Sequence, residues 1–225
     1  MKKIFILLFG ITFSFSALAQ NNPEGNSNVT NRLPKNHNLE GGGEADNSGF
    51  GIKGGVNFNQ LRGSDKSNLH DFSNKTTWHA GIYGQFQVRN SKFFSIQSEV
   101  LFNRHAFTSD SLDVKTDNLE VPLLFVFNVF DNVSVHVGPY AGVLLTVKEN
   151  GVEKGGDVKS MMNSFNYGLA GGVEAKISFA RIGARYNLGL NDIYKDPRVV
   201  DRLNHKVVSD LKNGAFQVYV GVGFQ

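Results

Sequence analysis

The C-terminal stretch Phe216-Gln217-Val218-Tyr219-Val220-Gly221-Val222-Gly223-Phe224 carries the pattern from which the fold can be predicted. Large apolar residues occupy every second position, and glutamine, tyrosine and glycine fill the positions between them. Successive side chains of a β-strand point to opposite faces, so this alternation predicts a strand with one apolar face. A segment of about nine residues is long enough to cross a bilayer as a tilted strand.

The same alternation recurs upstream, and the chain is predicted to contain eight such strands. The alternating segments cover residues 50–59, 78–88, 94–103, 120–128, 134–145, 165–176, 181–190 and 216–224. Eight amphipathic strands of this length are expected to close into one antiparallel barrel, because closure removes the unpaired edges of the sheet.

The connections between these segments alternate in length. Short turns are expected around Arg89-Asn90-Ser91, at Asp131-Asn132 and near Ser178. The other connections are expected to be long polar loops: Arg62 to Thr76, Arg104 to Thr116, Lys148 to Met161, and Asp192 to Asn213. This layout is typical of up-and-down barrels of the bacterial outer membrane, whose short turns lie in the periplasm and whose long loops lie outside.

The first 48 residues are predicted to lie outside the barrel. Lys2 and Lys3, the apolar run Ile4 to Phe15 and the site Ala17-Leu18-Ala19 form the three parts of a secretory signal peptide over residues 1–19. Residues 20–48 are rich in Asn, Gly, Pro, Glu and Ser, which predicts a disordered periplasmic arm because such a segment buries little apolar surface. The barrel domain is then expected over residues 49–225.

Composition excludes several classes of function. The chain has no cysteine, which excludes a lipid-modified cysteine, disulfides and thiolate metal sites. Lys2 and Lys3 supply two of the three net positive charges, which leaves +1 for the mature chain. Near-neutral charge without a basic stripe argues against a nucleic-acid partner. The sequence has no metal-ligand spacing, phosphate loop or dinucleotide fingerprint, so no cofactor is expected.

The two faces of the predicted strands distinguish a membrane barrel from a soluble one. Six charged residues are expected to face the lumen, together with glycine and polar residues: Lys53, Glu99, Glu120, Glu174, Arg181 and Arg185. A polar interior and an apolar exterior are typical of a transmembrane barrel, whereas a soluble periplasmic barrel that binds an apolar ligand has the reverse polarity. We therefore predict an all-β, eight-stranded antiparallel up-and-down transmembrane barrel in the bacterial outer membrane.

Charges in so narrow a lumen are expected to form ion pairs. Arg185 is expected to pair with Glu99 or Glu120, because a guanidinium group can bind a carboxylate with two hydrogen bonds. A purely structural pairing is the simpler interpretation, and a switchable gate in a small pore is the alternative. Aromatic residues near the strand ends predict a girdle at the membrane interface: Phe58, Trp78, Phe86, Phe94, Phe102, Phe127, Phe130 and Phe224.

Several strands carry short motifs: Gly51-Ile52-Lys53-Gly54-Gly55-Val56-Asn57-Phe58, Ser95-Ile96-Gln97-Ser98-Glu99-Val100-Leu101-Phe102, Leu119-Glu120-Val121-Pro122-Leu123-Leu124, Val137-Gly138-Pro139-Tyr140-Ala141-Gly142 and Ala184-Arg185-Tyr186-Asn187-Leu188-Gly189-Leu190. Together they resemble the PorT-like outer-membrane β-barrel family of Bacteroidota-type bacteria, with Ser98 in place of the family's usual proline. The resemblance covers about Gly49 to Phe224 and implies an eight-stranded outer-membrane barrel but little biochemistry. The namesake is associated with type IX secretion. Barrel assembly usually reads a final aromatic residue, whereas Gln225 follows Phe224 here.

Function is predicted only as a class. We expect a monomeric, non-enzymatic barrel with a structural or interaction role, in contact with outer-membrane lipid and with other envelope or secretion proteins. A narrow pore or a type IX secretion component is the alternative, and a soluble periplasmic barrel is a second one.

Two further features of the predicted loops bear on function. The segment Asp192 to Asn213 is apolar enough to form a short amphipathic helix or to pack on the barrel mouth. Catalysis would need Ser, His and acidic residues at one rim, and two loops contain them without a recognisable spacing: His105, Ser109 and Asp110, and His205, Ser209 and Asp210. No catalytic residues are therefore assigned.

Overall fold

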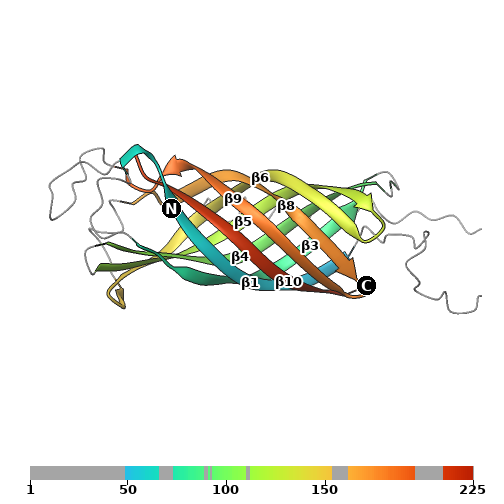
Figure 1. Ribbon diagram of the computed structural model, residues 1–225, viewed down its shortest axis with the longest axis horizontal. Helices are drawn as coiled ribbons and strands as arrows, with labels where there is room; N and C mark the ends of the chain where they lie inside the picture. Colours follow the sequence, from blue (N-terminus) through green and yellow to red (C-terminus); the bar gives the residue numbers. More distant parts are fainter. Residues whose placement is uncertain are drawn as a thin grey trace, which may run out of the picture. The chain divides into compact units, whose positions relative to one another are not determined.

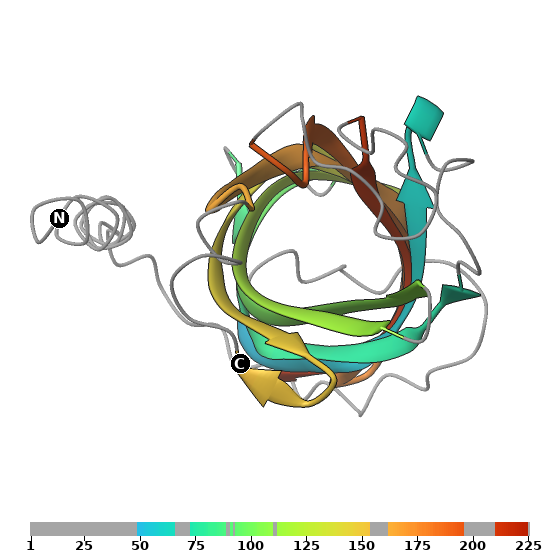
Figure 2. The same cartoon turned by 90° about the vertical axis from the view of Figure 1, so that its left-hand side faces the viewer.

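The computed structural model describes residues 49–65, 73–88, 91, 93–109, 112–153, 162–195 and 210–224. Within these residues, eight long strands form one closed antiparallel sheet (Figures 1 and 2). They are β1 (Gly49–Arg62), β3 (Thr76–Gln87), β4 (Phe94–Ser109), β5 (Leu112–Phe130), β6 (Val133–Glu149), β8 (Phe165–Ile177), β9 (Ala180–Asp192) and β10 (Lys212–Phe224). The two-residue strands β2 (Ser73–Asn74) and β7 (Val152–Glu153) pair with β4 and β6. Among the described residues, no helix is long and apolar enough to cross a bilayer.

The ring closes between the first and the last long strand. β1 pairs with β10 from Phe50↔Phe224 to Arg62↔Lys212, and the remaining long strands pair with their neighbours along the chain. The strands are tilted to the barrel axis (Figure 1), as closure of a sheet into a barrel requires. The predicted eight-stranded up-and-down barrel is therefore confirmed. The predicted signal peptide and arm lie outside the described residues and stay predictions.

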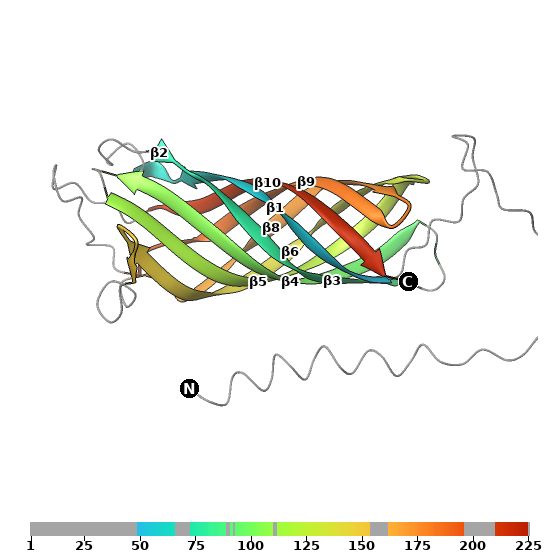
Figure 3. The same cartoon turned by 90° about the horizontal axis from the view of Figure 1, so that it is seen from below.

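Two of the three predicted short turns lie where the sequence predicts them, and Arg89 and Asn90 of the third lie outside the described residues. β5 and β6 are joined through Asp131–Asn132, and β8 and β9 through a turn in which Ser178 has a left-handed backbone, with φ of 57°. β2 and the C-terminus lie at opposite ends of the barrel (Figure 3). The short turns lie at the end where β1 begins and β10 ends. This is the periplasmic end by the usual layout of such proteins.

The predicted long loop from Arg104 to Thr116 is wrong. β4 continues to Ser109 and β5 begins at Leu112, so this segment forms the top of a long hairpin. Its charged residues are cross-strand partners: Arg104 lies opposite Asp117 in the register and donates to its carboxylate from Nε and Nη2, at 2.6 and 2.9 Å. Alternating charges resembled a solvated loop, but opposite charges at facing positions also stabilise a strand pair.

The other predicted connections begin within one residue of the observed strand ends: β1 ends at Arg62 and β3 begins at Thr76, with the two-residue β2 between them. β6 continues to Glu149 and turns through Asn150 and Gly151 into β7, and β10 begins at Lys212. Residues 196–209 lie outside the described residues, and so does most of the segment for which an amphipathic helix was considered.

The faces of the strands have the predicted polarity. Large apolar side chains point outward and are exposed, for example Phe50 (62 %) and Ile82 (58 %), whereas Lys53, Glu99 and Arg185 point inward and are buried. The interior is not polar throughout, however. Leu124, Val126, Tyr140 and Ala170 form an apolar patch on its β5, β6 and β8 wall.

Three inward tyrosine rings lie over glycines on the neighbouring strand. Tyr219 of β10 faces Gly183 of β9 in the register, and a Cβ added to Gly183 would stand only 2.3 Å from the ring. Tyr83 over Gly51 and Tyr140 over Gly168 repeat the arrangement. A flat ring against a bare backbone fills the narrow lumen without pushing the strands apart.

Replacing Gly183 by alanine should destabilise the barrel by about 1–3 kcal/mol, because the methyl group would force the Tyr219 ring out of its place. Urea unfolding of the detergent-folded protein would measure the loss. Gly171→Ala is the matched control, since a Cβ there meets nothing nearer than 3.8 Å. Equal stability of the two variants would contradict the packing role of the glycine.

Candidate functional site: the lumen, its mouth and the outer face

Five charged side chains form a chain of alternating sign in the lumen. Arg185 Nη1 lies 2.9 Å from Glu99 Oε2, and the other oxygen of Glu99 lies 2.6 Å from Lys53 Nζ. Lys53 Nζ lies 3.7 Å from Glu174 Oε2, and Arg181 Nη1 donates to Glu174 Oε1 at 3.0 Å. Of the two partners considered for Arg185, the structure thus brings Glu99 into contact. Each of the two carboxylates of this chain lies between two cations.

Neutral side chains complete the coordination of this ion chain. Gln217 Oε1 accepts hydrogen bonds from Nε and Nη2 of Arg185, at 3.1 and 2.9 Å, and Gln97 Nε2 donates to Glu99 at 2.6 Å. Tyr219 Oη donates to Glu174 at 2.9 Å, and its ring lies 4.1 Å from Lys53 Nζ. Removing charges from water costs several kcal/mol per ion, so a buried ion chain is tolerated only when such hydrogen bonds satisfy it.

Glu120 is the sixth predicted lumen charge, and it makes no direct contact with the lysine or the two arginines of the ion chain. Asn103 Nδ2 donates to its Oε2 at 2.7 Å, and His105 Nε2 lies 3.3 Å from its Oε1. Asn57 links it to the ion chain, since Asn57 donates to Asn103 at 2.7 Å and accepts from Gln217 at 2.9 Å. The six predicted residues therefore belong to one hydrogen-bonded network, in which three cations balance three carboxylates.

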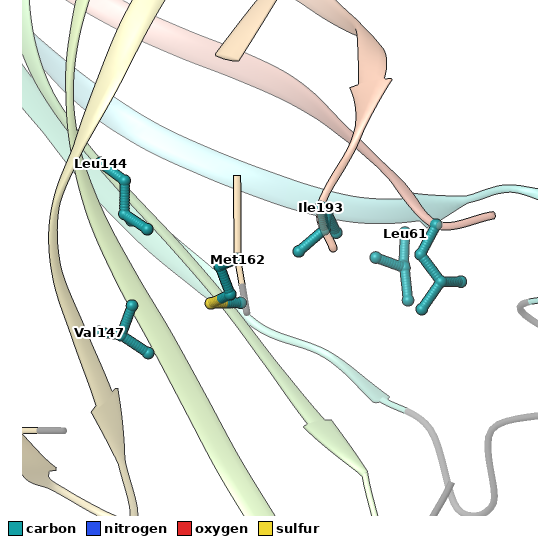
Figure 4. Packing of buried hydrophobic residues seen from close by; sticks show 6 residues of the cluster. Leu61, Leu144, Val147, Met162 and Ile193 are labelled. Atoms are coloured by element: carbon teal, nitrogen blue, oxygen red, sulfur yellow. The ribbon is translucent and has the colours of Figure 1, made fainter. Parts of the chain in front are cut away.

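An apolar cluster lies toward the loop end of the barrel, beyond the polar network (Figure 4). It consists of Leu61, Leu144, Val147, Met162, Ile193 and Leu211, all buried. Hydrogen bonds tie its loop residues together: Ile193 N–H donates to Leu211 O at 2.7 Å, and Asn163 N–H donates to Ile193 O at 2.8 Å. The cluster thus fills the mouth with side chains from β1, β6 and two connections.

A small cavity lies beside Glu120 and His105 of the network. Its lining is polar: His105, Glu120, Tyr140, Asn166, Gly189, Asn191 and Asn213. The free volume of about 10 Å³ is near the minimum for one water molecule. This polar cavity is too small for an apolar ligand of the kind that a soluble ligand-binding barrel encloses.

The sequence did not single out the mouth cluster. Its residues are scattered over β1, β6 and segments that were predicted as polar loops, so no periodic pattern joins them. Apolar residues at the ends of those loops, such as Ile193 and Leu211, were the available signal. The segment from Asp192 to Asn213 was expected either to form an amphipathic helix or to pack on the barrel mouth. Its described ends, which contain Ile193 and Leu211, pack on the mouth.

Aromatic residues mark two levels on the outer face. Trp78 stacks on Phe102 and Phe58 contacts Phe216 toward the loop end, with ring centroids 5.2 and 6.3 Å apart. Residues at the turn end include Phe50, which contacts Phe86 at 5.6 Å. Phe50 and Phe58 are separated by about 26 Å of strand, or roughly 20 Å along the axis after tilt. An apolar band of this height between two aromatic levels matches the hydrocarbon core of an outer membrane.

The residues considered for catalysis do not form a catalytic arrangement among the described residues. His105 points into the lumen, where it contacts Asn59 and Glu120 rather than a rim serine. Asp110, His205 and Ser209 lie outside the described residues. Asp210 accepts a hydrogen bond from the Ser64 hydroxyl at 2.6 Å, but hydrogen bonds from Lys212 and Ser64 lower the pKa of Asp210, which makes it a weak base.

A closed eight-stranded barrel with an apolar outer band and a filled polar interior defines an outer-membrane β-barrel protein. The family model described as "Outer membrane protein beta-barrel domain" matches residues 18–195, so the chain belongs to this family and is a protein of the bacterial outer membrane. The match supports the general family and does not reach to the PorT-like group. Sequence comparison with curated proteins finds no relative.

One solved structure supports the fold, and two others are similar to a smaller extent. Neisserial surface protein A (NspA) superposes with a TM-score of 0.53 at 15 % identity, over 79 % of this chain and 98 % of that chain. OprG from Pseudomonas aeruginosa gives 0.45 at 12 % identity, over 81 % and 99 %. Ail from Yersinia pestis gives 0.44 at 14 % identity, over 79 % and 99 %. At these identities the similarity to NspA bears on the fold alone.

Glu99 is expected to be the most sensitive residue of the lumen. Glu99→Ala leaves Lys53 and Arg185 facing each other without the carboxylate between them, so it should destabilise the barrel by about 3–5 kcal/mol. Arg185→Ala should cost less, because Glu99 keeps its contact with Lys53. Urea unfolding, followed by the shift in gel mobility between unheated and boiled samples, measures both.

Asp113→Asn is the control for this comparison. It removes an ion pair with Lys75 that is about one-third exposed, and pairs of this kind contribute little to stability. The pairing interpretation fails if Glu99→Ala is as stable as this control, or if Arg185→Ala is the more damaging change.

Proposed function

We propose that this protein is a non-conducting, non-enzymatic barrel that acts through the part projecting beyond the outer face of the membrane. The observation that carries the proposal is the filled interior. The ion chain occupies the lumen at one level, and the apolar cluster occupies the mouth at another. With the interior closed in this way, the surface left for interaction is the outside of the molecule.

The projecting part is built from three long strands. β4, β5 and β6 have 16, 19 and 17 residues, whereas the other long strands have 12 to 14. Their extra length lies above Trp78, at the loop end. The membrane-facing bands do not need this length, so a sheet that continues beyond the bilayer is available for contacts with other molecules.

The charged network has a structural role in this proposal. Two carboxylates each contact two cations, and amide and phenol groups satisfy the rest. Such an arrangement stabilises one packing of a narrow lumen. A switchable gate would instead need a second arrangement of comparable energy.

The motifs shared with the PorT-like family support a finer assignment to barrels of Bacteroidota-type bacteria. Within that assignment, a place in a type IX secretion system is the alternative to a general interaction role, by analogy of fold. The monomeric state is part of the proposal, since the closed part of the sheet leaves no strand edge inside the bilayer for a second copy.

Planar-bilayer recording tests the closed lumen. The folded protein should give no discrete current steps in concentrated potassium chloride, because charge pairs and an apolar constriction both oppose the passage of hydrated ions. Each preparation should first show the heat-dependent gel shift of a folded barrel. Reproducible steps from such a preparation would favour the narrow pore instead.

Lipid analysis tests the absence of enzymatic activity. Extracts from cells with and without the gene should contain the same lipid A and phospholipid species, since the Ser64 hydroxyl at the described part of the rim has only the weak base Asp210 as its partner. A species that depends on the gene, and disappears in an Asp210→Asn variant, would contradict the non-enzymatic assignment.

A further inference from the structure

Two lysines face each other on the projecting sheet. Lys115 of β5 and Lys148 of β6 are direct partners in the antiparallel register. Their neighbours Val114 and Val147 pack in or against the apolar cluster of the mouth. Because adjacent residues of a strand point to opposite faces, the two lysines point away from the barrel axis, toward the surroundings of the projecting sheet.

The carboxylates nearest to these lysines already have other partners. Asp117 accepts two hydrogen bonds from Arg104, and Asp113 accepts from Lys75 and from Thr108, at 2.5 and 2.7 Å. Lys75 and Thr108 lower the pKa of Asp113, and the charge of Lys115 contributes to a smaller extent, but no ion-pair contact joins Lys115 or Lys148 to either carboxylate. Glu153 holds the register position on the other side of Lys148, so the row formed with the two lysines keeps a net positive charge.

Like charges at directly opposed positions of a strand pair are destabilising. The side chains start only about 5 Å apart, a distance that one anionic group can bridge. An arrangement that is unfavourable for the chain alone becomes favourable when a phosphate lies between the two ammonium groups.

The level of the lysines identifies the source of the phosphate. The Arg104 guanidinium lies 5.4 Å from the ring of Trp78, which belongs to the upper aromatic level. Lys115 is opposite Ala106, two residues or about 7 Å of strand beyond Arg104. Aromatic residues of this kind lie at the headgroup level of a membrane, so the lysines lie just above the acyl chains, where lipid phosphates are found.

We infer that Lys115 and Lys148 bind a phosphate group of a phosphorylated glycolipid in the outer leaflet. This inference rests on the proposal that the projecting sheet is the interaction surface, and it names one class of partner for that surface. Arg104 on Trp78 borders the site from below. The lipid would hold the β5–β6 side of the sheet close to the membrane surface.

The test compares lipids that differ only in phosphate. The detergent-folded full-length protein is titrated with lipid A and with dephosphorylated lipid A, followed by native mass spectrometry and by fluorescence of Trp78, the single tryptophan. Lipid A should bind more tightly than the dephosphorylated form. Lys115→Gln and Lys148→Gln should each weaken its binding about fivefold, the usual contribution of one lysine at a membrane surface.

Lys212→Gln is the matched control, because it removes one positive charge at the loop end from a lysine that is paired with Asp192 and Asp210. Equal weakening by Lys148→Gln and Lys212→Gln would overturn the inference, since it would reflect net charge alone. Equal binding of dephosphorylated lipid A would overturn it too. Inorganic phosphate that competes at equal concentration would identify a free-anion site instead of a lipid site.

These outcomes are separate from those of the proposed function. The protein could show no current steps and still bind lipid A and dephosphorylated lipid A equally. It would then remain a closed barrel with an interaction surface, but its partner would not be this lipid. Current steps in a protein that binds lipid A through the lysines would leave the lipid site intact and overturn the closed lumen.

Discussion

The hydrocarbon layer offers no hydrogen-bond partner to a peptide group, and the rest of this structure depends on that constraint. Strands that cross it must close on themselves, as β1 and β10 do here. Closure with eight strands leaves an interior just wide enough for side chains. Charged groups that point inward must therefore find their partners inside the barrel, and this requirement turns six charged residues into one connected network.

The network shows how a narrow lumen can hold full charges. Glu99 lies between Arg185 and Lys53, and Glu174 lies between Lys53 and Arg181. The alternation of sign along the chain offsets the loss of solvation, and amides and tyrosines supply the remaining hydrogen bonds. Tyrosine rings over glycines add bulk where the charges leave room, as Tyr219 does over Gly183. The interior is filled by complementary shapes as well as by complementary charges.

The chemical character of the outer face changes along the barrel axis. Between the aromatic levels it is apolar and meets lipid chains. Above Trp78, the continuing strands β4, β5 and β6 carry charged residues in cross-strand pairs, of which Arg104 with Asp117 is the clearest. Lys115 and Lys148 depart from this pattern on the side where they face each other, although Glu153 faces Lys148 from β7. The departure lies at the height where anionic headgroups begin, which is where two facing lysines can bind an anionic group outside the chain.

The sequence by itself determined the features that depend on neighbouring residues. An alternation with period two assigns each side chain of a strand to the lipid or the lumen, so the fold, the strand count and the inward position of the six charges were predictable. A local pattern also gave one wrong prediction. The charged residues at the top of the β4–β5 hairpin are typical of a loop, and only the partner strand shows that they form cross-strand pairs.

Only the tertiary structure decided the contacts across the lumen. Glu99 and Arg185 are 86 positions apart and meet because the closed ring places β4 and β9 on facing walls. Their distance depends on the stagger of all the strands between them, which no local pattern encodes. For the same reason, the six residues of the mouth cluster come together from β1, β6 and two connections that share no periodicity. Periodicity assigns a side chain to a face, whereas its partner is set by the register of the whole sheet.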